Sequence, residues 1–362
     1  MSARVSPVDH APIVDAHLDL AHNAVASGRD LTLPLEVLRE RERRTRETAM
    51  VTLPELRDGG VDLVFGTLFA SPARRLAMQA AAAGATPVAP VLDPKGYVDA
   101  DGAHEQASAQ LDWYERMEQA GWIRLIRSRY DLDALRADRA ARGDAPVGLV
   151  VLMEGADPIR TPDELERWWE RGVRIVGPAW QGTRYAGGTR APGPLTALGR
   201  ELIDAMSRRG MALDVSHLAD ESLWEALERH RGAVLASHSN ARALTPTDRH
   251  LSDEALRALG ERSAVVGLVL GNAFLDVSAD RTGSVGLARV GEHFEHVAAL
   301  VGAERVGIGS DLDGGFGAEE TPVELGRGRD LRRLGEAVPK AHRSAFLGTA
   351  WWSWLERSLP AS

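Results

Sequence analysis

The chain has 362 residues, a formal net charge of −9 and no cysteine, which excludes disulfides, cysteine-ligated zinc, iron–sulfur clusters and thiol nucleophiles. Acidic and basic residues are mixed along the sequence, which argues against a nucleic-acid partner. No apolar stretch reaches the 18 residues of a membrane-spanning helix, and residues 1–10 lack the apolar core of a secretory signal. We therefore expect a cytoplasmic protein with no membrane partner.

Apolar runs rich in β-branched residues predict eight principal strands. They lie near residues 13–18, 61–68, 147–153, 173–179, 211–216, 233–237, 264–270 and 306–310. Helical segments separate most of them, which is typical of a parallel sheet covered on both faces. Eight such units over this length favour a single (β/α)8 TIM-barrel domain spanning residues 1–362.

Residues 71–121 contain an Ala-rich segment, a Pro/Asp/Gly stretch and a helical segment. We interpret them as an insertion, or an elaborated crossover, after the second strand. An open, doubly wound sheet is the alternative architecture. No Gly-x-Gly-x-x-Gly pattern follows the first strand to support a dinucleotide-binding version of that fold.

Polar side chains gather where the predicted strands end. In a TIM barrel these carboxyl ends share one rim, where active sites lie. Five of the strands contribute the following residues: His17, Asp19, Glu154, His217, His238 and Asp311. Histidine and carboxylate side chains suit zinc or a similar divalent ion. Five ligands are too many for one catalytic zinc that keeps an open position, so they predict a two-metal site.

Taken singly, each of these residues also has a structural interpretation. His217 and His238 could be strand-end histidines bonded to the backbone. The stretch from Asp311 to Gly314 could be a plain turn, and it lacks the later ligands of an EF-hand loop that it superficially resembles. If the residues had only structural roles, such interpretations would have to hold at all five strand ends at once.

Six segments resemble the membrane (renal) dipeptidases, which are binuclear zinc hydrolases with amidohydrolase-like barrels. The segments lie at residues 14–19, 153–157, 195–202, 210–217, 236–243 and 307–314, in the family's order, and the Ser-His-Ser-Asn-Ala-Arg-Ala block is specific. The resemblance implies two zinc ions, although other divalent metals fit the same ligands. It assigns His17 and Asp19 to one metal and His217 and His238 to the other, with Glu154 bridging them.

The resemblance also implies a substrate site. Arg249, eleven residues after His238, falls where the family binds the substrate's carboxylate. Asp311 falls where the family holds the substrate amine and the attacking water, and thus implies a catalytic role beside Glu154. Two positions depart from the family pattern: Gln181 replaces a histidine thought to polarise the scissile carbonyl, and Phe274 replaces a substrate-binding tyrosine.

These features predict a zinc-dependent dipeptidase that hydrolyses short peptides with a free C-terminal carboxylate by means of a metal-activated bridging water. Gln181 and Phe274 keep a second enzyme class open on the same site: an N-acyl amino acid deacylase, a cyclic amide hydrolase or a lactonase. A catalytically silent metal-binding homologue is the third alternative, although Asp311 and Arg249 argue against it. We expect the partner to be a small dipeptide-like substrate. The sequence is also compatible with a homodimer.

Overall fold

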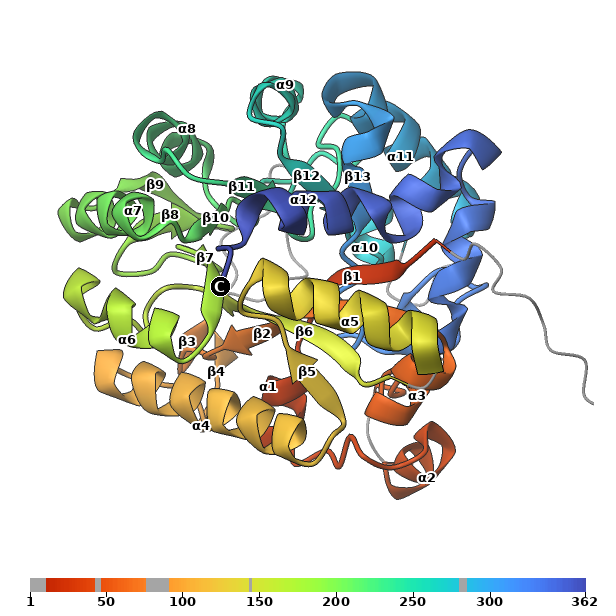
Figure 1. Ribbon diagram of the computed structural model, residues 1–362. Helices are drawn as coiled ribbons and strands as arrows, with labels where there is room; N and C mark the ends of the chain where they lie inside the picture. Colours follow the sequence, from red (N-terminus) through yellow and green to blue (C-terminus); the bar gives the residue numbers. More distant parts are fainter. Residues whose placement is uncertain (1–10, 43–46, 76–90, 143–144, 280–284) are drawn as a thin grey trace, which may run out of the picture.

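Eight parallel strands close into a barrel in the computed structural model, which describes residues 11–42, 47–75, 91–142, 145–279 and 285–362 (Figure 1). The barrel strands are β1 (Ile13–Leu18), β2 (Val61–Phe69), β6 (Val147–Glu154), β7 (Val173–Gly177), β10 (Ala212–Asp214), β11 (Val234–Ala236), β12 (Val265–Leu268) and β13 (Val306–Ile308). Each pairs with its neighbours in this order, and β13 pairs with β1 to complete the ring. The predicted TIM barrel is confirmed, and the open sheet is wrong because no gap remains between neighbouring strands of this ring.

All eight predicted strands coincide with barrel strands, but several end earlier than the sequence suggested. The runs predicted at 211–216 and 306–310 stop at Asp214 and Ile308. Soon afterwards the backbone leaves the sheet, and His217 and Asp311 adopt left-handed conformations with φ of 67° and 58°. Such angles are incompatible with a strand ladder. The apolar pattern continues past the last paired residue because these turns are still buried.

Helices surround the barrel (Figure 1). They are α1 (Leu20–Val25), α2 (Leu35–Arg41), α3 (Leu53–Asp58), α4 (Ala100–Gln119), α5 (Arg129–Arg142), α6 (Leu165–Glu170), α7 (Ala197–Arg209), α8 (Asp220–Arg229), α9 (Asp253–Glu261), α10 (Asn272–Leu275), α11 (Leu287–Val301) and α12 (Ala350–Ser358). Local sequence sets several boundaries: Thr196 caps α7 through the Gly199 N–H, and Gly210 ends that helix with φ of 78°. Among the described residues, no helix is long and apolar enough to cross a membrane.

The segment at 71–121 contributes two short antiparallel strands and a long helix. The strands are β3 (Arg74–Arg75) and β4 (Val91–Leu92), and residues 76–90 between them lie outside the described residues. Helix α4 packs against β2 and the short strand β5 (Ile123–Leu125), which pairs with the amino-terminal half of β6. A second hairpin, β8 (Ala186–Gly188) with β9 (Ala191–Leu195), lies between β7 and α7.

The interior of the barrel is filled from its own strands and from α12. Alternate strand residues such as Val14, Phe65 and Leu152 form one apolar cluster with tryptophans of α12. In Figure 1, α12 passes in front of β12 and β13. The Trp351 Nε1–H donates to the Ile308 carbonyl at 2.9 Å, and a Cβ on Gly307 would come within 2.3 Å of the Trp351 ring nitrogen. Helix α12 therefore completes the barrel core.

Replacing Trp351 should destabilise the barrel strongly. We expect Trp351→Ala to lower the free energy of unfolding by about 3–5 kcal/mol, because it removes a fully buried indole and leaves a cavity. Denaturant unfolding of the full chain measures the change. Trp224→Ala on α8, where the side chain is 43% exposed, is the matched control and should cost about 1 kcal/mol or less. Equal losses in the two variants would contradict this account of the core.

Candidate metal centre

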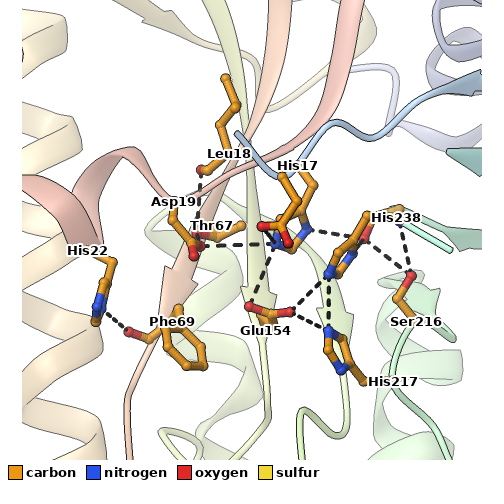
Figure 2. Close-up of polar contacts among 12 residues, drawn as sticks. His17, Leu18, Asp19, His22, Thr67, Phe69, Glu154, Ser216, His217 and His238 are labelled. Carbon is orange, nitrogen blue, oxygen red and sulfur yellow. Dashed lines mark hydrogen bonds and ion pairs between the residues drawn. The ribbon is translucent and has the colours of Figure 1, made fainter. Parts of the chain in front are cut away.

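The carboxyl ends of five barrel strands bring six buried polar residues together. His17 lies on β1 with Asp19 directly after it, and Glu154 is the last residue of β6. The other three residues follow β10, β11 and β13, and they are His217, His238 and Asp311. Figure 2 shows the imidazoles of His17, His217 and His238 turned toward the Glu154 carboxylate.

Glu154 lies at the centre of this arrangement. Its Oε1 is 3.1 Å from Nε2 of His217 and 3.3 Å from Nε2 of His238. Its Oε2 is 3.6 Å from Nε2 of His17, which in turn is 4.0 Å from Oδ1 of Asp19. The two carboxylate oxygens thus face two different sets of potential ligands. Glu154 belongs both to a cluster with His17 and Asp19 and to a cluster with His217 and His238.

The donor atoms fit divalent metal ions. Nε2 of His17 is buried and has no hydrogen-bond partner among the described residues, which is costly unless another group occupies that position. The Nε2 atoms of His217 and His238 are only 3.1 Å apart. Two imidazole nitrogens at this distance, beside one carboxylate oxygen, form a nitrogen and oxygen donor set of the kind that zinc and similar ions accept.

Hydroxyl groups orient the imidazoles from behind. The Ser237 hydroxyl donates to Oδ2 of Asp214 at 2.6 Å, which leaves its oxygen to accept from Nδ1 of His238 at 2.7 Å and from Nδ1 of His17 at 3.2 Å. Thr189 Oγ1 lies 3.0 Å from Nδ1 of His217. With the proton on Nδ1, the lone pair on Nε2 points into the site, as metal binding requires.

The same supporting motif occurs twice in the barrel. Asp214 accepts hydrogen bonds from the Ser216 and Ser237 backbone N–H groups and from the Ser237 hydroxyl. Asp15 likewise accepts from the backbone N–H groups of His17 and Ser310 and from the Ser310 hydroxyl. Each motif ties one strand to the next just below the site.

Sequence reasoning missed these supporting residues. Asp15 and Asp214 each stand two or three positions before a histidine of the site, which is the one local signal available. Their serine partners come from a neighbouring strand, 295 and 23 residues away in the sequence. Thr67 on β2 donates a hydrogen bond to Asp19, and no local sequence pattern indicates this contact.

The surroundings shift the pKa values of Glu154 and of the site's histidines in different directions. Burial alone would raise the pKa of Glu154, but His17, His217 and His238 outweigh it and hold that pKa well below the usual range. Burial disfavours charge on His17, yet Glu154, Asp311 and Asp19 together raise its pKa to about 9. Burial, assisted by Arg249, lowers the pKa of His217 to about 4. In the protein without metal, His17 is therefore the imidazole that carries a second proton, and with it a positive charge, at neutral pH.

Three of the predicted substrate residues, Arg249, Asp311 and Gln181, lie beside members of this cluster. The buried Arg249 guanidinium donates to the His238 carbonyl at 2.6 Å and to the Ser239 hydroxyl at 3.3 Å, and it lies 5.6 Å from the Phe274 ring centroid. Oδ1 of Asp311 is 3.9 Å from Nε2 of His17. Gln181, after β7, is buried and lines a hollow that also borders Glu154.

The sequence matches the model for the membrane dipeptidase family, peptidase family M19, over residues 3–346. The protein belongs to this family. The resemblance found in the motifs is thereby confirmed, and the protein is an enzyme of the metallo-dipeptidase type.

Solved structures and curated relatives agree with this membership. A metallopeptidase from Rhodobacter sphaeroides, solved with a phosphinate mimic of the dipeptide L-Ala-D-Ala, is 26% identical with a TM-score of 0.77, and the match covers 97% of this chain and all of that one. A protein of unassigned function from the region 5′ of pqqA in Klebsiella pneumoniae is 32% identical over 59% of this chain and 79% of its own length. Dipeptidase 3 of Rattus norvegicus is 27% identical over 55% of this chain and 42% of its own length.

Removing the shared hydroxyl behind two histidines should weaken metal binding. We expect Ser237→Ala to lower zinc affinity by about 10–100-fold, because His17 and His238 lose the acceptor that orients them. Competition with a chromophoric chelator measures the affinity. Ser353→Ala, at an exposed position on α12, should leave it unchanged. Equal affinities in the two variants would show that Ser237 does not orient the ligands.

Zinc binding should also depend on pH through His17. Because its pKa is raised to about 9 in the metal-free protein, zinc must displace a proton from it at neutral pH. We expect the apparent zinc affinity to increase about tenfold per pH unit between about pH 6 and pH 8 from this proton alone. Titrations with a chelator of known pH dependence measure the slope. An affinity that does not change over this range would contradict the assignment.

Proposed function

We propose that the protein is a zinc-dependent dipeptidase that hydrolyses the amide bond of short peptides with a free C-terminal carboxylate. The observation that carries the proposal is the position of Glu154, which is shared between two sets of possible ligand atoms, close to the buried Arg249 that donates to the His238 carbonyl. Membership in the membrane dipeptidase family and the neighbour solved with a dipeptide mimic support the same activity.

The residues that would hold the metals divide around Glu154. His17 and Asp19 would bind one ion and His217 and His238 the other, with one Glu154 oxygen directed to each set. Zinc ions bound there would supply a water of lowered pKa and Lewis acidity toward the amide carbonyl. Other divalent ions fit the same donor atoms.

Arg249 is suited to bind the substrate's carboxylate. Its guanidinium is buried against the His238 carbonyl, and Nε has no hydrogen-bond partner among the described residues. The guanidinium therefore retains donor capacity, and a carboxylate satisfies such a group in bidentate fashion. A clamp for a terminal carboxylate favours dipeptides over longer peptides, because the scissile amide must lie a fixed distance away.

Asp311 is suited to carry the proton that the leaving amine needs. Burial raises its pKa well above the usual range, with the negative charges of Asp19 and Glu154 adding to the effect. A carboxyl group of this kind can accept a proton from the attacking water and pass it to the departing nitrogen. Gln181 can donate a neutral hydrogen bond to the carbonyl oxygen as negative charge develops there.

The second candidate is hydrolysis of an N-acyl amino acid, a cyclic amide or a lactone on the same site. Gln181 carries no positive charge, and Phe274 offers Arg249 a ring face at 5.6 Å rather than offering the substrate a hydroxyl. An N-acyl amino acid has the free carboxylate that Arg249 requires but no free amine. A silent metal-binding homologue is the third outcome that the experiment must separate.

The test combines metal analysis with a panel of substrates. We expect about two zinc ions per chain and cleavage of L-Ala-L-Ala or L-Ala-D-Ala in preference to N-acetyl-L-alanine and a simple lactone. Arg249→Met should raise KM for the dipeptide about 10–100-fold, since a charged hydrogen bond contributes roughly 1.5–3 kcal/mol. KM for the dipeptide amide, which lacks the carboxylate, should stay the same.

Arg231→Met, at an exposed position after α8, is the matched control and should leave both KM values unchanged. An unaltered dipeptide KM in Arg249→Met would refute the clamp. Cleavage of only N-acyl amino acids or lactones would favour the second candidate. A metal-loaded protein that hydrolyses none of the panel would overturn the dipeptidase proposal.

A further inference from the structure

The turn of the β8–β9 hairpin contacts two different parts of the candidate site. Thr189 and Arg190 are the two residues between the strands of this hairpin. The Thr189 hydroxyl lies 3.0 Å from Nδ1 of His217. The Arg190 backbone N–H donates to Oδ2 of Asp248 at 2.6 Å, and Asp248 directly precedes Arg249. Two neighbouring residues thus connect a possible metal ligand with the arginine proposed to bind the substrate's carboxylate.

The backbone of this turn has an uncommon conformation. Arg190 has φ of 61°, in the left-handed region, where residues other than glycine are infrequent. Such a conformation persists where the surrounding contacts fix it. The hydrogen bond from the Arg190 N–H to Asp248 is one such contact, so the hairpin and the loop that carries Arg249 fix each other.

On its other side the hairpin is attached to α8 and to the loop after β7. The hydroxyl of Ser222, a fully buried residue of α8, accepts from the Gly187 N–H at 3.0 Å. The same hydroxyl donates to the Gly193 carbonyl at 2.8 Å, which joins both strands of the hairpin. The Thr189 N–H donates to the Trp180 carbonyl at 3.2 Å. The hairpin is therefore part of the rigid frame of the barrel rather than a free-standing loop.

Arg249 is held at its side chain and beside its backbone by different groups. Its guanidinium donates to the His238 carbonyl and to the Ser239 hydroxyl. Asp248 is exposed, and its contact with the hairpin holds the chain next to Arg249. Burial lowers the pKa of Arg249, and Asp248 is among the carboxylates that oppose this shift. Because Asp248 is exposed, its removal should cost the fold little.

The distance between Arg249 and the metal ligands limits the spacing of two groups in a substrate. In an ordinary dipeptide one carbon separates the scissile amide nitrogen from the free carboxylate. β-Alanine as the second residue adds one methylene and moves the carboxylate farther from the amide. A misplacement of about 1 Å can cost about 100-fold in rate. A clamp held at a fixed distance from the metal ligands therefore distinguishes these two substrates.

We propose that Asp248 is a positioning residue for Arg249, and that the β8–β9 hairpin fixes the distance between this clamp and His217. The protein then selects dipeptides that end in an α-amino acid over dipeptides that end in a β-amino acid. This inference rests on the proposed dipeptidase function and deepens it, since it names the spacing required in the substrate and the residues that set it.

The test compares three substrates on the zinc-loaded full chain: L-Ala-L-Ala, L-Ala-β-alanine and L-Ala-L-Ala amide, which lacks the carboxylate. In the wild type we expect kcat/KM for L-Ala-L-Ala to exceed that for L-Ala-β-alanine about 100-fold. Asp248→Ala should raise KM for L-Ala-L-Ala about tenfold, change kcat less, and reduce the preference over L-Ala-β-alanine about tenfold. KM for the amide should stay the same, a result that a general loss of structure would not give.

Two further substitutions at this position show how Asp248 acts. Asp248→Asn keeps an oxygen that can accept from the Arg190 N–H and should retain most of the preference. Asp248→Glu keeps the charge but adds a methylene, so it should displace the loop and reduce the preference, which tests the proposal even if Asp248→Ala fails to fold. Asp133→Ala, at an exposed position on α5, is the matched control and should leave the kinetics of all three substrates unchanged.

Zinc affinity separates the two contacts of the turn. Thr189→Val removes the hydroxyl beside Nδ1 of His217 and should lower zinc affinity about 10–100-fold. Asp248→Ala should leave zinc affinity unchanged, because the contact that it removes is with the Arg190 backbone. Competition with a chromophoric chelator measures both. A lower zinc affinity in Asp248→Ala would place its effect on the metal centre and overturn its role in positioning Arg249.

The outcomes separate this inference from the function on which it rests. A wild-type protein that cleaves no dipeptide contradicts the proposed function. A wild-type protein that cleaves L-Ala-L-Ala and L-Ala-β-alanine equally well overturns this inference alone. The same holds if Asp248→Ala and Asp248→Glu keep the wild-type KM and preference, or if Asp248→Asn loses as much of the preference as Asp248→Ala.

Discussion

The structure depends on one buried carboxylate held among three imidazoles. Removing Glu154 from water disfavours its charge, and the surrounding histidines reverse that cost and keep it ionised. Because its two oxygens face different histidines, a single side chain from β6 links His17 of β1 with the histidines that follow β10 and β11. The closed barrel matters to function because it brings these three sides of the ring within reach of one glutamate.

The barrel supports this arrangement with paired polar motifs below the site. Asp15 with Ser310 and Asp214 with Ser237 each satisfy a buried carboxylate with two backbone N–H groups and one hydroxyl. Buried polar groups are tolerated when they are fully bonded, and such networks hold their members in one geometry. Through Ser237 this geometry extends to two of the histidines, so their orientation is a property of the barrel rather than of flexible loops.

The two sides of the opening offer different chemistry. The side after β11 and β12 carries a buried guanidinium against an aromatic ring, whereas the side formed at β2, β6 and β7 carries two anchored aromatic rings with no free charge from Asp157. Gln181 and Phe274 stand at the two positions where the motifs depart from the family pattern, and neither belongs to the clusters of potential metal ligands around Glu154.

The sequence by itself determined the eight strands, the barrel and the identity of the residues at the strand ends, because burial and periodicity are local properties that residues such as Val147–Glu154 display directly. The resemblance in the motifs added the family. Strand ends were less predictable, since His217 and Asp311 remain buried after the ladder has ended. Only the tertiary structure decided that Glu154 divides its oxygens between two ligand sets, that Ser237 serves two histidines, and that Tyr97 reaches Asp157 sixty residues away. These contacts join distant strands across the mouth of the barrel, and no local pattern of residues records which side chains will meet there.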